Sequence, residues 1–171
     1  MSEPPAEGPP LRNLLIITPN FWPENFRINE VAEVLVAAGV GVTVLTGQPN
    51  YPEGRAYPGY RAWHAGWTRT PFGAEVARVP VVTRGAARPL RLAVSYAVFL
   101  ASISVIGPFL LRRRRVDAIL YYGVSPLVPA LAGFWFRLLK RAPFALWVQD
   151  LWPGNVKAVG FELGRAVVPL R

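Results

Sequence analysis

The sequence predicts an α/β fold of the Rossmann-like kind, with a mostly parallel sheet and helices on both of its faces. Short apolar stretches alternate along the chain with longer stretches whose apolar residues recur at helical spacing. The short stretches are continuously apolar, as strands are when helices cover both faces of a parallel sheet. With 171 residues, of which 52% are hydrophobic, the chain is long enough to build one domain around a core.

The N-terminal third is predicted to form a β-α-β unit. Leu14–Thr18 is a short apolar run typical of a buried strand, and residues 28–38 place apolar side chains at helical spacing. Gly39 is expected to end that helix, because glycine readily adopts the left-handed conformation that follows a helix. Val40–Thr46 is rich in β-branched residues and is the second predicted strand.

The rest of the chain continues this alternation. Residues 47–61 contain three Pro and three Gly, so we expect a long loop there. Pro80 lies inside the strand predicted over Val76–Val82, and proline cannot donate to a ladder, so that strand is expected at an edge of the sheet. The remaining predicted elements are a helix over Pro89–Leu111, a strand over Asp117–Tyr122, a helix over Pro126–Lys140, a strand over Phe144–Val148 and a helix over Val156–Val168.

Four loops follow predicted strands, at residues 19–29, 47–61, 123–126 and 149–155. Ligands of parallel sheets bind outside the carboxyl ends of the strands, so we expect these loops to converge on one binding edge. No G-x-G-x-x-G motif follows the first strand, where a dinucleotide-binding domain carries it. A classical NAD site is therefore not expected.

The net charge of +9 is distributed unevenly. Residues 1–111 carry nine Arg against seven Glu, whereas residues 112–171 carry eight Arg and two Lys against three acidic residues. A basic half of this kind suggests an anionic partner, such as phosphate groups or an anionic membrane surface. No nucleic acid partner is expected, because no base-stacking aromatic residues are interleaved with the arginines.

The composition also excludes several kinds of site. The chain has no Cys and one His, so it has no disulfide framework, no thiolate metal site and no His-rich metal site, and neither a metal nor a bound cofactor is expected. Residues 1–11 are acidic and Pro-rich and lack the features of a signal peptide. We expect them to form a disordered tail, and we expect the protein in the cytoplasm.

Residues 92–111 form an uncharged stretch long enough to cross a membrane, and four consecutive arginines follow it: Arg112, Arg113, Arg114 and Arg115. The stretch lies between two predicted strands of one sheet, and a span would put those strands on opposite sides of the membrane. The favoured interpretation is therefore a helix in the membrane interface, with the four arginines on anionic head groups. A helix buried in the core and a true span are the alternatives.

Four segments together resemble a known family. In chain order they are PNFWPENFRINEVAEVL, VTVLTGQPNYPEGRAYPGYR, VARVPVV and FALWVQDLWPGNVKAVG. This pattern resembles the N-terminal half of a family 4 glycosyltransferase, from the bacterial branch with fucosaminyl-type and colanic-acid-type transferases for cell-surface polysaccharides. The resemblance implies the two facing Rossmann-like halves of the GT-B fold. The N-terminal half would bind the acceptor and the C-terminal half the nucleotide-sugar donor.

The resemblance also implies a reaction. It is the transfer of a hexosyl or N-acetylhexosaminyl group from a nucleotide sugar to a lipid-linked, polyprenyl-diphosphate saccharide, at the inner face of the cell membrane. The donor half is not among the 171 residues. We therefore expect residues 12–171 to be an incomplete acceptor domain that is inactive alone. The alternatives are a non-catalytic glycolipid- or partner-binding module and a small single-span membrane protein.

Asp150 is the expected catalytic residue, because a carboxylate at the carboxyl end of a strand can orient or deprotonate an acceptor hydroxyl. Its neighbour Gln149 stands where many relatives have His, and its amide can hydrogen-bond a sugar hydroxyl. His64 is expected to have a surface role. The other expected substrate-binding residues lie in the first two loops and are Glu24, Asn25, Arg27, Asn50, Tyr51 and Arg55. Roles in capping or in turns are the alternative for these residues.

Overall fold

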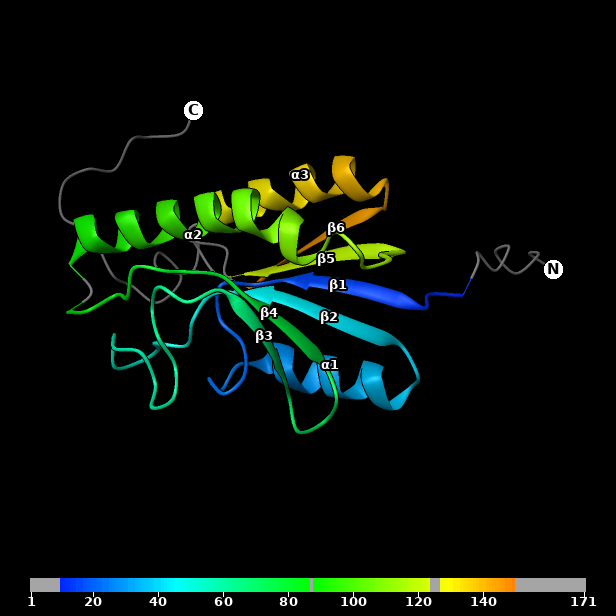
Figure 1. Ribbon diagram of the computed structural model, residues 1–171, viewed down its shortest axis with the longest axis horizontal. Coiled ribbons are helices and arrows are strands. Elements are labelled where there is room, and N and C mark those ends of the chain that lie inside the picture. Colours follow the sequence, from blue (N-terminus) through cyan, green and yellow to red (C-terminus); the bar gives the residue numbers. More distant parts are fainter. Residues whose placement is uncertain (1–9, 87, 124–126, 150–171) are drawn as a thin grey trace, which may run out of the picture.

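The computed structural model describes residues 10–86, 88–123 and 127–149. They form a six-stranded sheet of order β3-β4-β2-β1-β5-β6 (Figure 1). The pairing of β3 with β4 is antiparallel and the other four pairings are parallel, which confirms the predicted α/β, Rossmann-like fold. The elements are β1 (Asn13–Ile17), α1 (Arg27–Ala37), β2 (Gly41–Thr46), β3 (Gly66–Arg69), β4 (Glu75–Arg78), α2 (Pro89–Leu110), β5 (Ala118–Gly123), a 3-10 helix η1 (Val128–Ala130), α3 (Leu131–Lys140) and β6 (Phe144–Val148).

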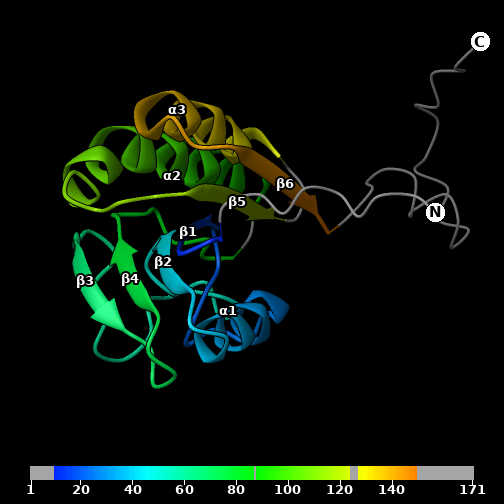
Figure 2. The same ribbon diagram turned by 90° about the vertical axis from the view of Figure 1, so that its right-hand side faces the viewer.

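The central strands are buried on both faces because helices cover both. Helix α1 lies on one face, and α2 and α3 lie side by side on the other (Figure 2). In β1, Leu14 and Ile16 pack on the α1 side, whereas Leu15 and Ile17 pack on the side of α2 and α3. This double burial explains the continuous apolar run in the sequence. Gly39, with φ +83°, ends α1 as expected.

Helix α2 is seated closely on the sheet. Its buried residues are Phe99, Ile103 and Gly107. A Cβ at Gly107 would lie 2.9 Å from Phe136 of α3 and 3.0 Å from Leu45 of β2, so glycine allows the helix to approach both. Helix α2 is also long and apolar enough to cross a bilayer by length and composition, although a core helix can satisfy the same test.

One sequence expectation about the β3–β4 side of the sheet is wrong, and one strand there was not expected. Strand β4 is not at an edge, because it pairs with β2 on one side and with β3 on the other. It ends at Arg78, before Pro80, so the proline removes no ladder hydrogen bond. Strand β3 was not predicted, because it is only four residues long and mostly exposed.

The helix boundaries differ more modestly from expectation. The predicted helix over Pro126–Lys140 begins later, with the 3-10 turn η1 preceding α3. The helix expected over Val156–Val168 lies outside the described residues, as do the loops at 124–126 and 150–155.

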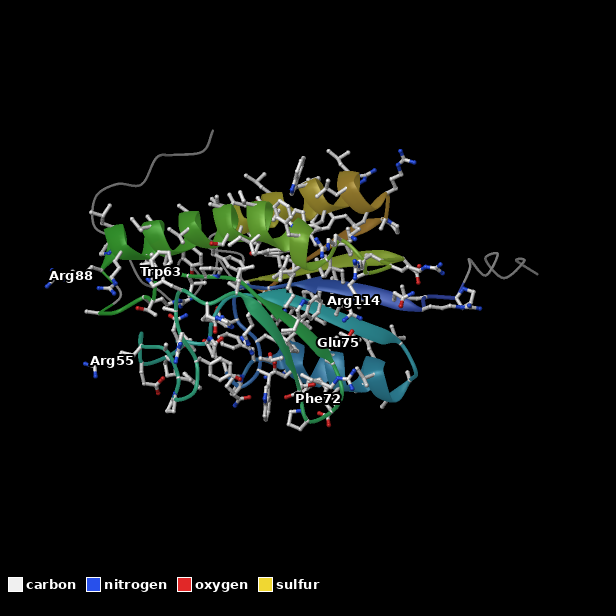
Figure 3. The ribbon with its side chains drawn as sticks, in the orientation of Figure 1. Arg55, Trp63, Phe72, Glu75, Arg88 and Arg114 are labelled. Carbon is white, nitrogen blue, oxygen red and sulfur yellow. The ribbon has the colours of Figure 1, made fainter. Side chains whose placement is uncertain are left out.

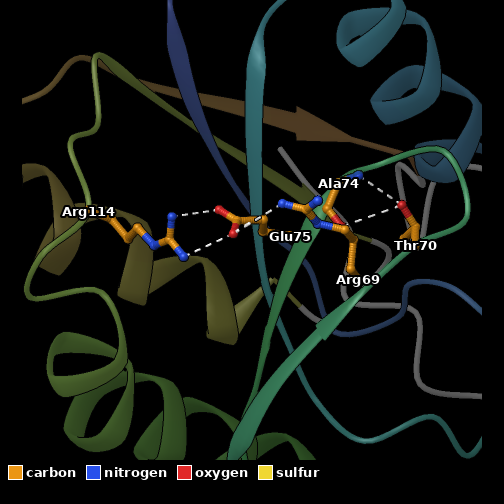
Figure 4. A network of polar contacts seen from close by, with 5 residues as sticks. All are labelled: Arg69, Thr70, Ala74, Glu75 and Arg114. Carbon is orange, nitrogen blue, oxygen red and sulfur yellow. Dashed lines mark hydrogen bonds and ion pairs between the residues drawn. The ribbon is translucent and has the colours of Figure 1, made fainter.

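Two polar networks hold the amino-terminal edge of the sheet. The Asp117 carboxylate accepts hydrogen bonds from the backbone N–H of Asn13 at 2.8 Å and from its side-chain amide at 3.1 Å, which joins the starts of β1 and β5. In the second network, Glu75 at the start of β4 pairs with Arg114 at 2.7 Å and with Arg69 at 3.7 Å (Figure 4). Arg114, the third of the four consecutive arginines, is therefore engaged within the fold.

Candidate functional site

Three loops meet at the carboxyl ends of β1, β2 and β4, and we call residues 18–26, 47–61 and 79–86 the loop cluster. These strands are neighbours in the sheet, so the loops that follow them lie together. The ladder continues into the cluster, where the N–H of Thr18 donates to Leu45 O at 3.1 Å and the N–H of Val79 donates to Thr46 O at 2.9 Å. The first two predicted loops therefore converge, as expected.

Glu24 joins two of these loops. Its side chain is buried, and its Oε1 accepts hydrogen bonds from the backbone N–H groups of Asn50 and Tyr51, both at 2.7 Å. Burial raises the pKa of Glu24, and the two backbone donors and the positive charge of Arg84 oppose that shift. The carboxylate thus fixes the loop after β2 against the loop after β1.

Arg84 extends this junction to α2. Its guanidinium donates to Asn20 Oδ1 at 3.4 Å and to the Tyr96 hydroxyl at 3.2 Å, and it lies over the rings of Tyr51 and Tyr96. Its backbone N–H donates to Asn50 Oδ1 at 3.2 Å. All three loops and the first half of α2 are therefore connected through one arginine.

Arg78, the last residue of β4, is a buried cation. It is 2% exposed and donates to Gly47 O at 2.9 Å, to Thr68 Oγ1 at 3.3 Å and to Trp22 O. Its guanidinium also lies 4.9 Å from the centre of the Tyr60 ring. Burial lowers the pKa of Arg78, and Tyr60 and Glu24 oppose that shift. The guanidinium of Arg78 therefore connects the loops after β1 and β2 with strand β3, at the base of the loop cluster.

A hollow of about 560 Å³ opens beside Arg78, between the loop after β2 and the β3–β4 hairpin. Gln48 is buried at its wall and donates to His64 O at 2.7 Å. His64 Nε2 lies 3.0 Å from the position that a Cβ would take at Gly66, so glycine leaves room for the imidazole. The side chains that line the hollow are Gln48, Tyr60, Arg61, His64, Trp67, Thr68 and Arg78.

The structure separates the predicted site residues into two groups. Glu24 and Asn50 are buried and bonded within the cluster. Tyr51 is 41% exposed, with its ring against Phe26 and under Arg84. Asn25, Arg27 and Arg55 are exposed, and Arg55 lies at the outer end of its loop (Figure 3).

Gln149 follows β6, at the other side of the sheet. The N–H of Gln149 donates to Gly123 O at 3.1 Å, which extends the β5–β6 ladder by one residue. Strand β6 is separated from β2 by β1 and β5, so Gln149 shares the carboxyl edge with the loop cluster without joining its hydrogen-bond network in the described part of the chain. Asp150 lies outside the described residues.

Arg112 to Arg115 lie at the opposite end of α2 from the loop cluster. The helix has 22 residues, which corresponds to a length of roughly 33 Å at 1.5 Å per residue. Arg88, at the start of α2, and Arg114 lie well apart in Figure 3. The arginine run therefore lies away from the loop cluster, and its link to the hollow beside Arg78 is indirect, through Trp67, on which Arg114 stacks.

Sequence reasoning missed Gln48, Arg78 and Arg84. It gave His64 a surface role, and His64 is exposed, although it also lines the hollow. An arginine between Val76 and Val79 in an otherwise apolar predicted strand was the available signal for Arg78, because a buried cation needs acceptors. In chemical terms the hollow offers amide, imidazole, guanidinium and aromatic groups. These suit a polar, hydroxyl-rich or anionic ligand.

Comparison with known proteins adds no assignment. The chain matches no protein-family model and no curated protein.

Proposed function

We propose that this chain is the acceptor-binding half of a glycosyltransferase, which moves a sugar from a nucleotide sugar to a polyprenyl-diphosphate-linked saccharide. The observation that carries the proposal is the junction made by Glu24. It joins the PENFRIN and NYPEG segments, two of those on which the family resemblance rests, through hydrogen bonds to Asn50 and Tyr51. Residues that are far apart in the sequence thus form one loop cluster at the edge where parallel sheets bind ligands.

The hollow supports the same proposal through its chemistry. Saccharides are bound by planar polar groups that match their hydroxyls and by aromatic rings that cover their apolar faces. The hollow combines Gln48 and His64 with Tyr60 and Trp67, and Arg61 adds a guanidinium that suits a phosphate. An acceptor that carries both a sugar and a diphosphate fits this combination.

Within this proposal the exposed residues meet the acceptor and the buried ones hold the loops. Tyr51 stacks on a sugar ring, and Arg27 and Arg55 meet the diphosphate. Gln149 hydrogen-bonds a hydroxyl, and Asp150 orients the attacking one. Nucleotide-sugar binding belongs to a second half that these 171 residues do not include, so no transfer is expected from this chain alone.

The test is a calorimetric titration of the purified chain with a short-chain prenyl-diphosphate N-acetylhexosamine and, separately, with a nucleotide sugar. We expect the prenyl-linked sugar to bind and the nucleotide sugar to give no measurable heat. Arg61→Gln, in the hollow, should weaken binding, whereas Arg69→Gln, at the end of β3 and outside the hollow, should not. Tight binding of the nucleotide sugar alone would contradict the proposal.

A further inference from the structure

The outward face of α2 is apolar along its whole length. Its exposed side chains recur every three or four residues, so they form one stripe on the helix. They include Leu90, Val94, Val105 and Phe109, of which Phe109 is 68% exposed. Helix α2 therefore has one apolar face buried on the sheet and a second apolar face that no described part of the chain covers.

Helix α3 continues this apolar surface. It lies beside α2 on the same side of the sheet (Figures 1 and 2). The Trp135 indole N–H donates to Ser104 O at 3.2 Å, which ties the two helices together near their middle. The exposed apolar residues of α3 are Leu131, Phe134, Trp135, Leu138 and Leu139. We call the exposed sides of α2 and α3 the outer helical face.

The charge around the outer helical face has one sign. Residues 88–116 and 127–149 contain no Asp or Glu. Arg114 is engaged, since it pairs with Glu75 and stacks on Trp67 at 4.7 Å. Arg112, Arg113 and Arg115 are exposed and make no hydrogen bond or ion pair with any other described residue.

A shallow hollow of mixed character adjoins the free arginines. It has a volume of about 530 Å³, and it is lined by three apolar residues, Trp67, Phe109 and Leu110, and by three arginines, Arg112, Arg113 and Arg114. Apolar walls beside cationic groups suit a lipid, whose acyl chain and phosphate make both kinds of contact.

We propose that the outer helical face docks on an anionic lipid bilayer, with α2 and α3 lying in the plane of the interface. The apolar side chains enter the acyl boundary, and Arg112, Arg113 and Arg115 meet lipid phosphates. An in-plane position is favoured over a span because the other side of α2 is packed on the sheet, where Phe99 and Ile103 are buried against strand residues such as Leu45. The proposal rests on this surface alone and stands or falls separately from sugar transfer.

The test is co-sedimentation of the purified full chain with phosphatidylcholine vesicles that contain or lack phosphatidylglycerol. We expect binding only to the anionic vesicles. Each basic residue at such a surface contributes about fivefold to partitioning, so the double change Arg112→Gln and Arg113→Gln should weaken binding about 25-fold. Arg12→Gln, an exposed cation that precedes β1 and belongs to neither α2 nor α3, is the matched control and should leave binding unchanged.

A second pair of variants tests the apolar contact. Leu138 in α3 is 71% exposed and Val34 in α1 is 68% exposed, so both sites should accept Glu without unfolding. Leu138→Glu should weaken vesicle binding by about tenfold or more, and Val34→Glu should have no effect. Circular dichroism melts would verify that both variants are folded.

Three results would overturn the proposal. The first is equal binding of Leu138→Glu and Val34→Glu to anionic vesicles. The second is resistance of the vesicle-bound chain to carbonate extraction, which indicates a span. The third is absence of vesicle binding together with a dimer that Leu138→Glu dissociates, since the outer helical face would then be an interface between two copies of the chain.

Discussion

The side chains of the loop cluster and those of the outer helical face have opposite surroundings. In the loop cluster, Glu24, Asn50 and Arg84 make hydrogen bonds to backbone and side-chain groups of the same chain, and so does Arg78 of β4 at its base. On the outer helical face, large apolar side chains such as Phe109 and Leu138 are left open. The polar residues of the motif segments therefore build a scaffold, whereas the apolar helices offer a surface to a partner.

This difference changes which residues are worth testing for ligand contact. A buried carboxylate with two backbone donors can be essential to the cluster without touching a substrate. The residues that remain available to a ligand are the exposed Tyr51, Arg27 and Arg55, and the side chains of the hollow beside Arg78. Substitutions can separate the two roles, because loss of scaffold lowers stability and loss of a ligand contact does not.

The largest effect is expected at Arg78. Arg78→Met should lower the free energy of unfolding by about 3–5 kcal/mol, because it leaves the carbonyls of Gly47 and Trp22 without their donors in a buried site. Urea unfolding followed by circular dichroism measures the change. Arg69→Met is the control, since the exposed Arg69 makes a weak ion pair at 3.7 Å, and it should change stability by less than about 1 kcal/mol. Equal effects of the two substitutions would remove the distinction between scaffold and surface.

Glu24 should give the next largest effect. Glu24→Ala leaves the backbone N–H groups of Asn50 and Tyr51 without an acceptor and should cost about 2–4 kcal/mol of unfolding free energy. Glu24→Gln keeps a side-chain oxygen in place and should cost much less. If the alanine and glutamine variants were equally destabilised, the hydrogen bonds would not be what holds the loops.

The same residue predicts a dependence on pH. Burial raises the pKa of Glu24 above its ordinary value of 4.5, so the folded protein holds this proton more tightly than the unfolded chain does. The contribution of Glu24 to stability is therefore complete below that value and falls as the pH rises through the folded pKa. Unfolding curves of the native chain and of Glu24→Gln over this range should converge at the acid end. A difference that does not vary with pH would contradict the buried carboxylate.

Sequence patterns were sufficient for the sheet because periodicity reflects burial directly. The runs at β1, β2 and β5 are apolar because helices cover both of their faces, and the sequence shows that directly. The run at β6 is equally apolar, although most of it is exposed in the described part of the chain. Strand β3 escaped detection because Gly66–Arg69 is short and exposed, and its pairing with β4 is what makes it a strand. Pro80 misled the prediction for β4 because the strand ends two residues before it.

The roles of the site residues were harder to predict from the sequence, because they depend on contacts between residues that are far apart in the chain. Glu24 meets Asn50 across 26 positions, and Arg78 reaches Trp22 across 56. Nothing local to either residue reveals whether its charge faces a ligand or a backbone carbonyl. The arginine run illustrates the same point, since four identical neighbours have different environments once Arg114 meets Glu75.

Substitution of Tyr121 should raise the free energy of unfolding, whereas the substitutions in the loop cluster should lower it. Its hydroxyl is buried in the layer under α2, and among the described residues it has no hydrogen-bond partner. Burial raises the pKa of Tyr121, so the group stays neutral. Tyr121→Phe removes an unsatisfied polar atom at little change in shape and should raise the free energy of unfolding by about 1 kcal/mol. A loss of stability of similar size would show that the hydroxyl is bonded after all.

The smallest effect on stability is expected at Arg114, and it should distinguish this residue from its neighbour Arg113. Arg114 makes paired contacts of 2.7 and 3.0 Å with Glu75 and stacks on Trp67, whereas Arg113 is free of such contacts in the described part of the chain. Arg114→Gln should therefore lower stability by about 0.5–1 kcal/mol, and Arg113→Gln should leave it unchanged. Thermal melts at low and high salt measure both, because the Arg114 contribution should shrink as salt screens the pair. On anionic vesicles the order of the two effects should reverse. Arg113→Gln should weaken binding more than Arg114→Gln, because the charge of Arg113 is available to lipid. If Arg113→Gln instead lowered stability and left vesicle binding intact, the division between scaffold and docking surface would fail at this end of α2.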